Sequence, residues 1–204
     1  MATETSFKDH LMNTCTNILW RGIDIIAENF PIFASRYYQK IIGDEYQKEY
    51  NQFNISADDS ILHIGCGTYP LTELILRSVC NPKKIKGIDN RKKATDIAQK
   101  YISTQKKNRR ITIDYGDGTQ YDLNGYSTII ISSCATPKTP ILNHLIHNAP
   151  SDTKIILREV ESSAPSIYSF LKCQKNLSIQ DSIIHHPFPF VKPFGWISYL
   201  IKKK

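Results

Sequence analysis

Helical patterns dominate the first part of the chain. Apolar residues recur at three- and four-residue spacing over residues 11–26, which is typical of one buried face of a helix. Pro31 is expected to end this helix, because proline removes a backbone donor and clashes with the preceding turn. A weaker helical pattern follows over residues 33–51, in which Gly43 is a candidate break. We therefore expect a helical cap over residues 1–55.

Short apolar runs alternate with helical patterns in the rest of the chain. The runs are rich in isoleucine and are bounded by turn-forming residues, as strands are. We expect strands over residues 60–64, 84–89, 111–114, 127–133, 153–160, 178–185 and 195–202, and helices over residues 71–80, 91–104, 139–148 and 165–173.

This alternation predicts the fold class. Strands that alternate with helices form parallel sheets with right-handed crossovers and helices on both faces. The last two strands are joined by a proline-containing loop instead of a helix, which predicts an antiparallel hairpin at or near the sheet edge. We therefore expect an α/β protein with a doubly wound, seven-stranded, mostly parallel sheet over residues 56–204 and the helical cap before it.

Composition places the chain among globular proteins of ordinary size. It has 204 residues, of which 41% are hydrophobic and 22% charged. Its apolar runs are too short to cross a bilayer, and its first residues do not resemble a signal peptide, so we expect no membrane partner and a cytoplasmic location. Five cysteines without a CxxC pair suggest neither a disulfide framework nor a zinc site.

The net charge of +7 is concentrated in one segment. Residues 83–110 hold eleven Lys or Arg and two Asp or Glu, a local excess of +9. Such a run is either a solvated helix with basic flanks or a patch for an anionic partner such as nucleic acid. The segment contains a single aromatic residue, Tyr101, and no RNA-binding motif, so a nucleic-acid partner is possible but not favoured.

A glycine-rich turn follows the first predicted strand. Gly65-Cys66-Gly67 lets the backbone turn sharply and approach a ligand without a Cβ in the way. The next helix begins near Pro70 or Leu71, and the free N–H groups of its first turn suit a carboxylate or a phosphate. In a doubly wound sheet, ligands bind beyond the carboxyl ends of the strands, which is where this turn lies.

Two more strands end in residues that suit an adenosine. Asp89, followed by Asn90, closes the second strand and can accept hydrogen bonds from both ribose hydroxyls. Asp117 and Gly118 follow the third strand, where an acid can accept from the adenine amine and a backbone amide can meet the ring. The three features together predict one adenosine-containing ligand across three neighbouring strand ends.

These segments resemble the class I S-adenosylmethionine-dependent methyltransferase superfamily. The resemblance covers residues 56–204 and implies a Rossmann-like methyltransferase fold with S-adenosylmethionine as cosubstrate. Gly65 and Gly67 would lie against the methionine part, Asp89 would hold the ribose, and Asp117 would hold the adenine amine. A nicotinamide dinucleotide is the competing ligand, but it favours G-x-G-x-x-G, and this chain has proline in place of the third glycine.

A narrower similarity concerns the segment from Gly65 to Thr72, Gly-Cys-Gly-Thr-Tyr-Pro-Leu-Thr. It is similar to the glycine-loop-Pro-Leu-Thr segment of nicotianamine synthases, as are Leu157-Arg158, Ser163-Ala164 and His186-Pro187. These enzymes share the methyltransferase fold but move the aminocarboxypropyl group of S-adenosylmethionine instead of its methyl group. The resemblance therefore offers a second type of transfer.

Substrate contacts are expected near the ends of the first and fourth strands, where the sulfonium would lie. Ser132 and Ser133 follow the fourth strand and are candidate contacts to the cosubstrate. This strand end lacks the Asp/Asn-Pro-Pro-aromatic motif of enzymes that methylate nucleobases or glutamine. Lys138 is a candidate for holding an anionic substrate, with a surface lysine as the alternative. Tyr37 and Tyr38 of the cap are candidate substrate contacts, with core packing as the alternative.

Three residues are candidates for catalysis. Glu159 and Glu161 follow the fifth strand and could act as base or amine receptor, or be solvated charges. Tyr69 lies inside the glycine loop and could face the sulfonium. The pair His185-His186 has no third ligand at metal spacing, so no metal is expected.

The sequence thus predicts a cytoplasmic S-adenosylmethionine-dependent transferase. Methyl transfer to a small-molecule or protein acceptor is favoured, because most proteins with this adenosine pattern transfer methyl. Aminocarboxypropyl transfer of the nicotianamine synthase kind is the first alternative, and a nucleic-acid-binding or -modifying methyltransferase that uses residues 83–110 is the second. No pattern in the chain specifies an oligomeric state.

Overall fold

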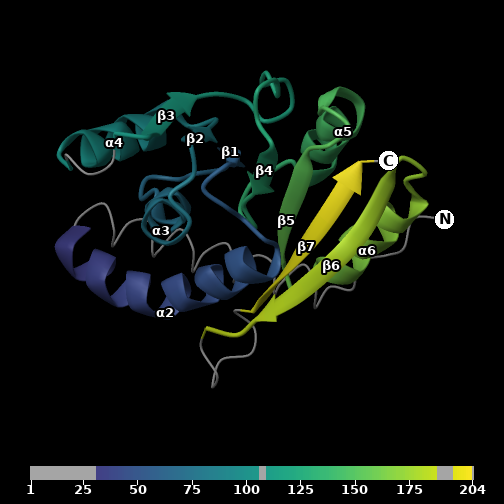
Figure 1. Ribbon diagram of the computed structural model, residues 1–204, viewed down its shortest axis with the longest axis horizontal. Coiled ribbons are helices and arrows are strands. Elements are labelled where there is room, and N and C mark those ends of the chain that lie inside the picture. The colour runs from purple at the N-terminus through teal and green to yellow at the C-terminus, as the bar shows by residue number, and fades with distance from the viewer. Residues whose placement is uncertain (1–30, 106–108, 188–194, 204) are drawn as a thin grey trace.

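The computed structural model describes residues 31–105, 109–187 and 195–203, and the side chains from residue 40 onward. Figure 1 shows a twisted sheet with helices packed against it. The described helices are α2 (Pro31–Gln52), α3 (Leu71–Val79), α4 (Lys92–Ser103), α5 (Lys138–Asn148) and α6 (Ala164–Cys173). The described strands are β1 (Ser60–Ile64), β2 (Lys84–Asp89), β3 (Ile111–Tyr115), β4 (Thr128–Ile131), β5 (Lys154–Val160), β6 (Leu177–His185) and β7 (Trp196–Lys203).

The seven strands form one sheet in the order β3-β2-β1-β4-β5-β7-β6. The first five strands run parallel, and β7 pairs antiparallel with both β5 and β6. The reversed hairpin therefore lies at the sheet edge, and the fold class predicted from the sequence is confirmed. The pairing of β6 with β7 shifts by one residue between Ile179 and Asp181, which marks a β-bulge in the edge strand.

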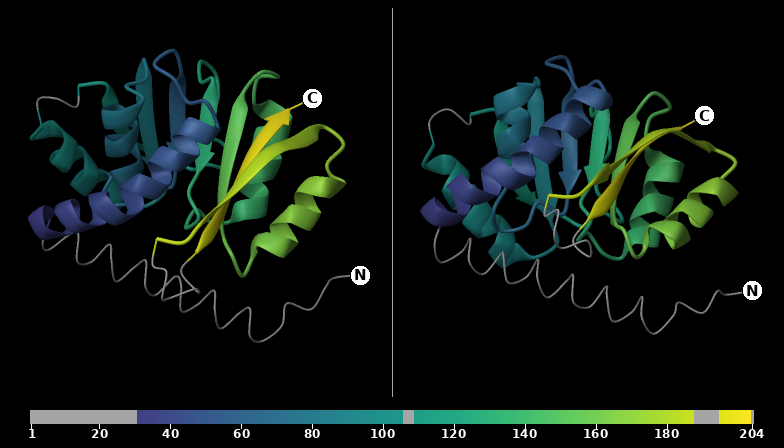
Figure 2. Two further views of the ribbon diagram at one scale, coloured as in Figure 1. Left: turned by 60° about the horizontal axis from the view of Figure 1, so that its bottom comes forward. Right: turned by 90° about the horizontal axis from the view of Figure 1, so that it is seen from below.

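Two hydrophobic clusters bury the two faces of the sheet. Leu62 and Ile64 of β1 pack with α5 and α6, whereas Ile61, the residue before Leu62, packs with α2, α3 and α4. Side chains alternate between the faces of a strand, so the apolar run of β1 serves both clusters. Figures 1 and 2 show α2 on the same face as α3, with α5 and α6 on the other.

Helix α2 differs from the prediction at two points. Pro31 is the first residue of this helix, two residues before the predicted start, because proline is tolerated in the first turn, where its missing N–H would have no partner. Gly43 does not break it: a Cβ there would lie 3.1 Å from Cδ1 of Ile75, so glycine allows α2 to approach α3 closely. The predicted helix over residues 11–26 lies outside the described residues.

No helix in the described segments combines the length and the apolar character needed to span a membrane.

Candidate active site

The turn between β1 and α3 adopts a backbone conformation that favours glycine. The φ angle is +88° at Gly65 and +68° at Gly67. The Gly65 amide donates to the carbonyl of Ile88 in β2 at 2.8 Å. A Cβ on Gly65 would lie 3.0 Å from the Cβ of Ala135 and 3.1 Å from the Cβ of Ser132. The turn is therefore held between the carboxyl ends of β2 and β4, and α3 begins directly after it.

Asp89 ends β2 beside this turn. Its side chain is only 6% exposed, and its Oδ2 accepts a hydrogen bond from the Gly67 amide at 3.0 Å. The backbone amide and the Nε of Arg91 each lie 3.0 Å from Oδ1. Asn90, the next residue along the chain, is exposed. The predicted ribose-binding acid is thus fixed to the glycine turn by a direct contact.

The loop after β3 folds over the end of β1. A Cβ on Gly118 would lie 2.5 Å from Cγ2 of Ile64, so only glycine fits there without displacing the strand. Asp117 is exposed, and its Oδ1 accepts from the backbone amide of Thr119 at 2.9 Å and from its hydroxyl at 2.8 Å. Since β1, β2 and β3 are neighbours in the sheet, the glycine turn, Asp89 and Asp117 lie along one edge.

Lys138 connects the ends of β4 and β5. Its ammonium group donates to the carbonyls of Ser132 at 2.5 Å, Ser133 at 3.2 Å and Arg158 at 3.3 Å. It also lies 3.9 Å from Oε2 of Glu159. Burial lowers the pKa of this lysine, and the nearby Glu159 carboxylate only partly offsets that effect. Lys138, predicted to hold an anionic substrate, is therefore directed at backbone carbonyls of the protein itself.

Glu159 and Glu161 occupy different environments although they are two residues apart. Glu159 is buried, its Oε1 accepts from the Val160 amide at 3.0 Å, and burial raises its pKa despite the opposing effect of Lys138. The Glu161 side chain is 37% exposed, and its Oε1 lies 3.8 Å from Nε2 of His186. Of the two acids, Glu159 has the environment that suits proton transfer.

Of the three tyrosines predicted to contact the substrate or the sulfonium, the structure describes the side chain of Tyr69 alone. The Tyr69 ring packs edge-on against Tyr101 of α4, with 5.1 Å between ring centroids and 3.5 Å between the hydroxyls. Tyr69 therefore leans toward α4. Tyr37 and Tyr38 lie on α2, but their side chains are outside the described part of the structure. Cys66, inside the glycine turn, is buried, and that burial raises the pKa of its thiol.

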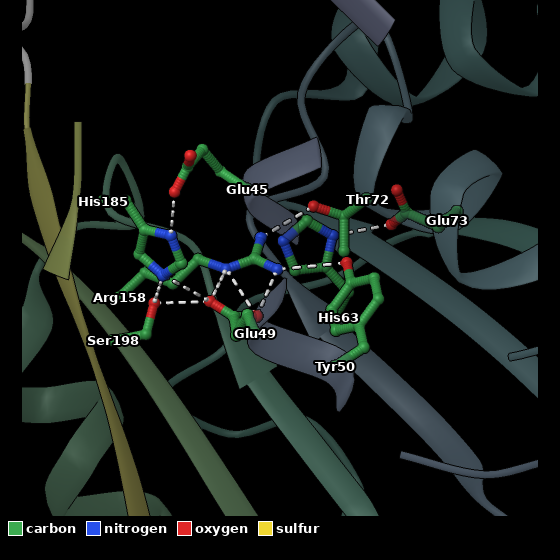
Figure 3. Close-up of polar contacts among 9 residues, drawn as sticks. All are labelled: Glu45, Glu49, Tyr50, His63, Thr72, Glu73, Arg158, His185 and Ser198. Carbon is green, nitrogen blue, oxygen red and sulfur yellow. Dashed lines mark hydrogen bonds and ion pairs between the residues drawn. The ribbon is translucent and has the colours of Figure 1, made fainter. Parts of the chain in front are cut away.

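A buried charge network that the sequence analysis missed lies between α2 and the sheet (Figure 3). The Arg158 side chain, 2% exposed, donates through Nε and Nη2 to the Glu49 carboxylate at 3.1 and 2.7 Å. Nη1 donates to the Thr72 hydroxyl at 2.8 Å, and Nη2 to the Tyr50 hydroxyl at 3.1 Å. The guanidinium also lies 3.8 Å from the ring centroid of Tyr46. These contacts join β5, α2 and the first turn of α3.

His185, at the end of β6, extends this network toward the surface of α2. Its Nδ1 lies 3.0 Å from Oε2 of Glu45, and its Nε2 lies 3.2 Å from the Ser198 hydroxyl, which in turn donates to Glu49. The ring stacks on Trp196 with 4.6 Å between centroids. Within the segments described, no group of three His, Cys, Asp or Glu side chains has the arrangement of a metal site.

One signal in the sequence could have revealed this network. Ile42, Tyr46 and Tyr50 form the apolar stripe of α2, and Glu49 falls inside that stripe. A carboxylate on a buried helical face needs a charged or hydrogen-bonding partner. The partner lies 109 positions away and could not be identified from spacing.

A second buried pair, His63 and Glu73, connects the strand before the glycine turn to the helix after it. Nδ1 of His63 in β1 lies 2.7 Å from Oε1 of Glu73 in α3, and both side chains are buried. A Cβ on Gly87 would lie 2.4 Å from that same Oε1, so the glycine of β2 makes room for the carboxylate. The pair fixes the start of α3 relative to β1.

The described basic residues between 83 and 110 include lysines at both ends of β2. Lys83 precedes β2 and lies 3.2 Å from Asp58, whereas Lys92 begins α4 beyond the opposite end of β2 and pairs with Asp96. The ends of a strand lie on opposite edges of its sheet, so Lys83 and Lys92 lie on different sides of the molecule. A nucleic-acid partner for this stretch, possible but not favoured, stays a prediction.

Several solved structures share the fold. A Glu-to-Gln mutant of MtNAS in complex with S-adenosylmethionine has a TM-score of 0.78 and 16% identity, and the match covers 98% of this chain and 79% of that chain. MtNAS in complex with MTA and tNA has a TM-score of 0.79 and 15% identity, covering 99% and 78%. A sarcosine dimethylglycine methyltransferase structure from Galdieria sulphuraria has a TM-score of 0.60 and 10% identity, covering 80% and 84%. No curated protein matches the sequence.

The fold and the strand-end residues define a transferase that uses S-adenosylmethionine, and the residues present fit this cosubstrate. A buried carboxylate at the end of β2 accepts a hydrogen bond from the Gly67 amide, which belongs to a turn with positive φ angles at both glycines. The model of the nicotianamine synthase protein family matches residues 11–192, most of the chain. The chain therefore belongs to the nicotianamine synthase family.

Proposed function

We propose that this protein transfers the aminocarboxypropyl group of S-adenosylmethionine to an amine of a small-molecule acceptor and releases methylthioadenosine. The observation that carries the proposal is the match to the nicotianamine synthase family over residues 11–192. The sequence pattern alone favours methyl transfer, because that reaction is commoner among proteins with this adenosine pattern. Family membership is the more specific evidence and reverses the preference.

The cosubstrate would bind across the carboxyl ends of four neighbouring strands. Gly65 and Gly67 would approach the methionine part, with Cys66 between them, and Asp89 would accept from the ribose hydroxyls. Asp117 would accept from the adenine amine. The flanking contacts would come from Asn90, Gly118, Ser132 and Ser133. S-adenosylmethionine supplies a sulfonium that activates the adjacent carbons toward a nucleophile.

Glu159 is the best-placed base of the described residues. An acceptor amine is protonated near neutral pH and must lose a proton before its nitrogen can attack carbon. Burial raises the pKa of Glu159, so this carboxylate binds a proton more readily than an exposed acid would. Lys138 holds the ends of β4 and β5 together beside it. Glu161 and Tyr69 would contact the acceptor from the more open side of the site.

The N-terminal segment would complete the acceptor side. We assign residues 1–55 to a helical lid and the candidate contacts Tyr37 and Tyr38 to that lid. Its described helix α2 shares a hydrophobic cluster with β1 and α3 through Ile42 and Tyr50. The lid would thereby be anchored to the domain that holds the cosubstrate.

Product analysis tests the proposal. The full-length protein is incubated with S-adenosylmethionine and a set of amino acids and small amines, and the nucleoside products are separated. Methylthioadenosine formation supports the proposal, whereas S-adenosylhomocysteine would show methyl transfer and overturn it. Glu159→Gln is expected to lower kcat by about 10²- to 10⁴-fold. Asp152→Asn, which alters an exposed carboxylate near Lys202, is the matched control and should leave kcat unchanged.

A further inference from the structure

The Asp89 carboxylate has no free acceptor position in this structure. Its Oδ2 accepts from the Gly67 amide at 3.0 Å and from Nη2 of Arg91 at 3.4 Å. Its Oδ1 accepts from the backbone amide and from Nε of Arg91, both at 3.0 Å. An ionised carboxylate has about four lone-pair sites, so these four contacts fill it.

Two of these contacts are fixed and two can be exchanged. The Gly67 and Arg91 amides belong to the backbone on either side of the site and stay in place as long as the turns do. The guanidinium contacts belong to a side chain that is 52% exposed, whereas Asp89 is 6% exposed. A long, half-exposed side chain gains conformational freedom when it is released, and water can replace its contacts to the carboxylate.

We propose that the Arg91 side chain competes with the ribose of S-adenosylmethionine for Asp89 and thereby sets the affinity for the cosubstrate. The proposal rests on the assignment of Asp89 to the ribose. Two ribose hydroxyls need two acceptor positions on this carboxylate, and displacement of the guanidinium provides both. Arg91 then turns toward solvent while the two backbone donors remain.

This competition has a measurable signature. If Asp89 is free of the Arg91 side chain in only a fraction of the molecules, the apparent dissociation constant for an adenosine ligand equals the intrinsic constant divided by that fraction. Salt screens an exposed ion pair, so added salt should release Arg91 and tighten the binding of an uncharged adenosine ligand. Methylthioadenosine is such a ligand, because it carries the ribose and the adenine without the charged methionine part.

The experiment measures methylthioadenosine binding to the full-length protein by calorimetry at low and high salt. Arg91→Met keeps an unbranched stem but removes every side-chain donor, and it is expected to tighten binding about three- to tenfold. Lys92→Met is the matched control: it removes one positive charge from the next residue, which pairs with Asp96 instead. Its affinity should equal that of the unaltered protein.

The salt series makes the test independent of the variant's folding. In the unaltered protein the affinity should rise with salt, whereas in Arg91→Met it should not change. Unchanged or weaker binding in folded Arg91→Met, or an affinity of the unaltered protein that does not rise with salt, overturns the proposal.

Asp89→Asn separates this inference from the assignment on which it rests. If Asp89→Asn binds methylthioadenosine as well as the unaltered protein, the ribose assignment itself fails. If Asp89→Asn binds weakly while Arg91→Met binds as before, only the competition fails. Neither result bears on which group is transferred, because product analysis decides that separately.

Discussion

The cosubstrate edge of the sheet and the network beneath α2 are built in opposite ways. At the cosubstrate edge, each residue follows its own strand directly, and the contacts depend on backbone groups of the turns. In the network, Glu49 meets Arg158 and Ser198, which lie 109 and 149 positions away. The first arrangement follows from local sequence, whereas the second exists only once the whole sheet has formed.

The two regions also differ in how much they depend on charge pairing. Asp89 is paired with a half-exposed arginine that water can replace. Glu49 and Arg158 are both fully enclosed, so neither has water available if its partner is lost. The network should therefore contribute far more to keeping the fold intact, and the cosubstrate edge far more to ligand affinity.

The largest effect is expected from Arg158→Met. This substitution leaves the Glu49 carboxylate buried without a charge partner and should lower the free energy of unfolding by about 3–5 kcal/mol. Urea unfolding followed by circular dichroism measures the loss. Arg110→Met, which removes an exposed arginine that bonds to Asn81 and Pro82, should cost less than about 1 kcal/mol. A similar small loss in both variants would contradict the distinction between the two regions.

An intermediate effect is expected from Gly118→Ala at the cosubstrate edge. The added Cβ would meet Ile64 at 2.5 Å and push the loop after β3 away from β1, costing about 1–3 kcal/mol of stability. The same displacement should weaken cosubstrate binding in calorimetry. Gly43→Ala is the matched control, because its Cβ would meet the side chain of Ile75, whose terminal methyl at 3.1 Å can shift, and alanine favours the helix. Equal cosubstrate affinity in both variants would show that the loop does not shape the site.

The smallest effect concerns the pH dependence of the network. Burial lowers the pKa of His185 below its usual 6.5, Arg158 acts in the same direction, and Glu49 and Glu45 oppose them. Because the folded state binds this proton less readily than the unfolded state, stability is full above about pH 6.5 and falls as the pH drops through the lowered pKa.

His185→Gln should therefore reduce the slope of the melting temperature between pH 7 and pH 5. The exposed His147, which bonds to the Asn143 carbonyl, provides the control substitution His147→Gln. A slope in His185→Gln as steep as in the unaltered protein would assign the pH dependence to other groups.

Most of the sheet could be predicted because its strands are buried, isoleucine-rich runs bounded by turn residues. The second strand was predicted over residues 84–89, as observed. The fourth was predicted over residues 127–133 but ends at Ile131, because the carbonyls of Ser132 and Ser133 accept from Lys138. A strand end that depends on a side-chain contact formed only in the folded chain cannot be located from the hydrophobic pattern.

The site was predictable to the extent that backbone geometry dictates it. Gly65 and Gly67 have positive φ angles, and such positions appear in a sequence as glycine. The surroundings of Glu159 and Lys138 were not predictable, because a charged residue in a sequence gives no sign of whether the fold buries it. Arg158 shows this most clearly: it lies inside β5, and the sequence gives no sign that the fold encloses its charged side chain almost completely.

The bulge in β6 bears on how the molecule avoids aggregation. An edge strand leaves a row of backbone donors and acceptors with which a strand of another chain could pair. Gln180 is the extra residue between Ile179 and Asp181, and its side-chain amide bonds back to the Ser178 hydroxyl at 2.7 Å. The irregular register interrupts that row, and the neighbouring exposed polar side chains keep it hydrated. The hairpin that completes the sheet thus also makes its outer edge a poor template for a further strand.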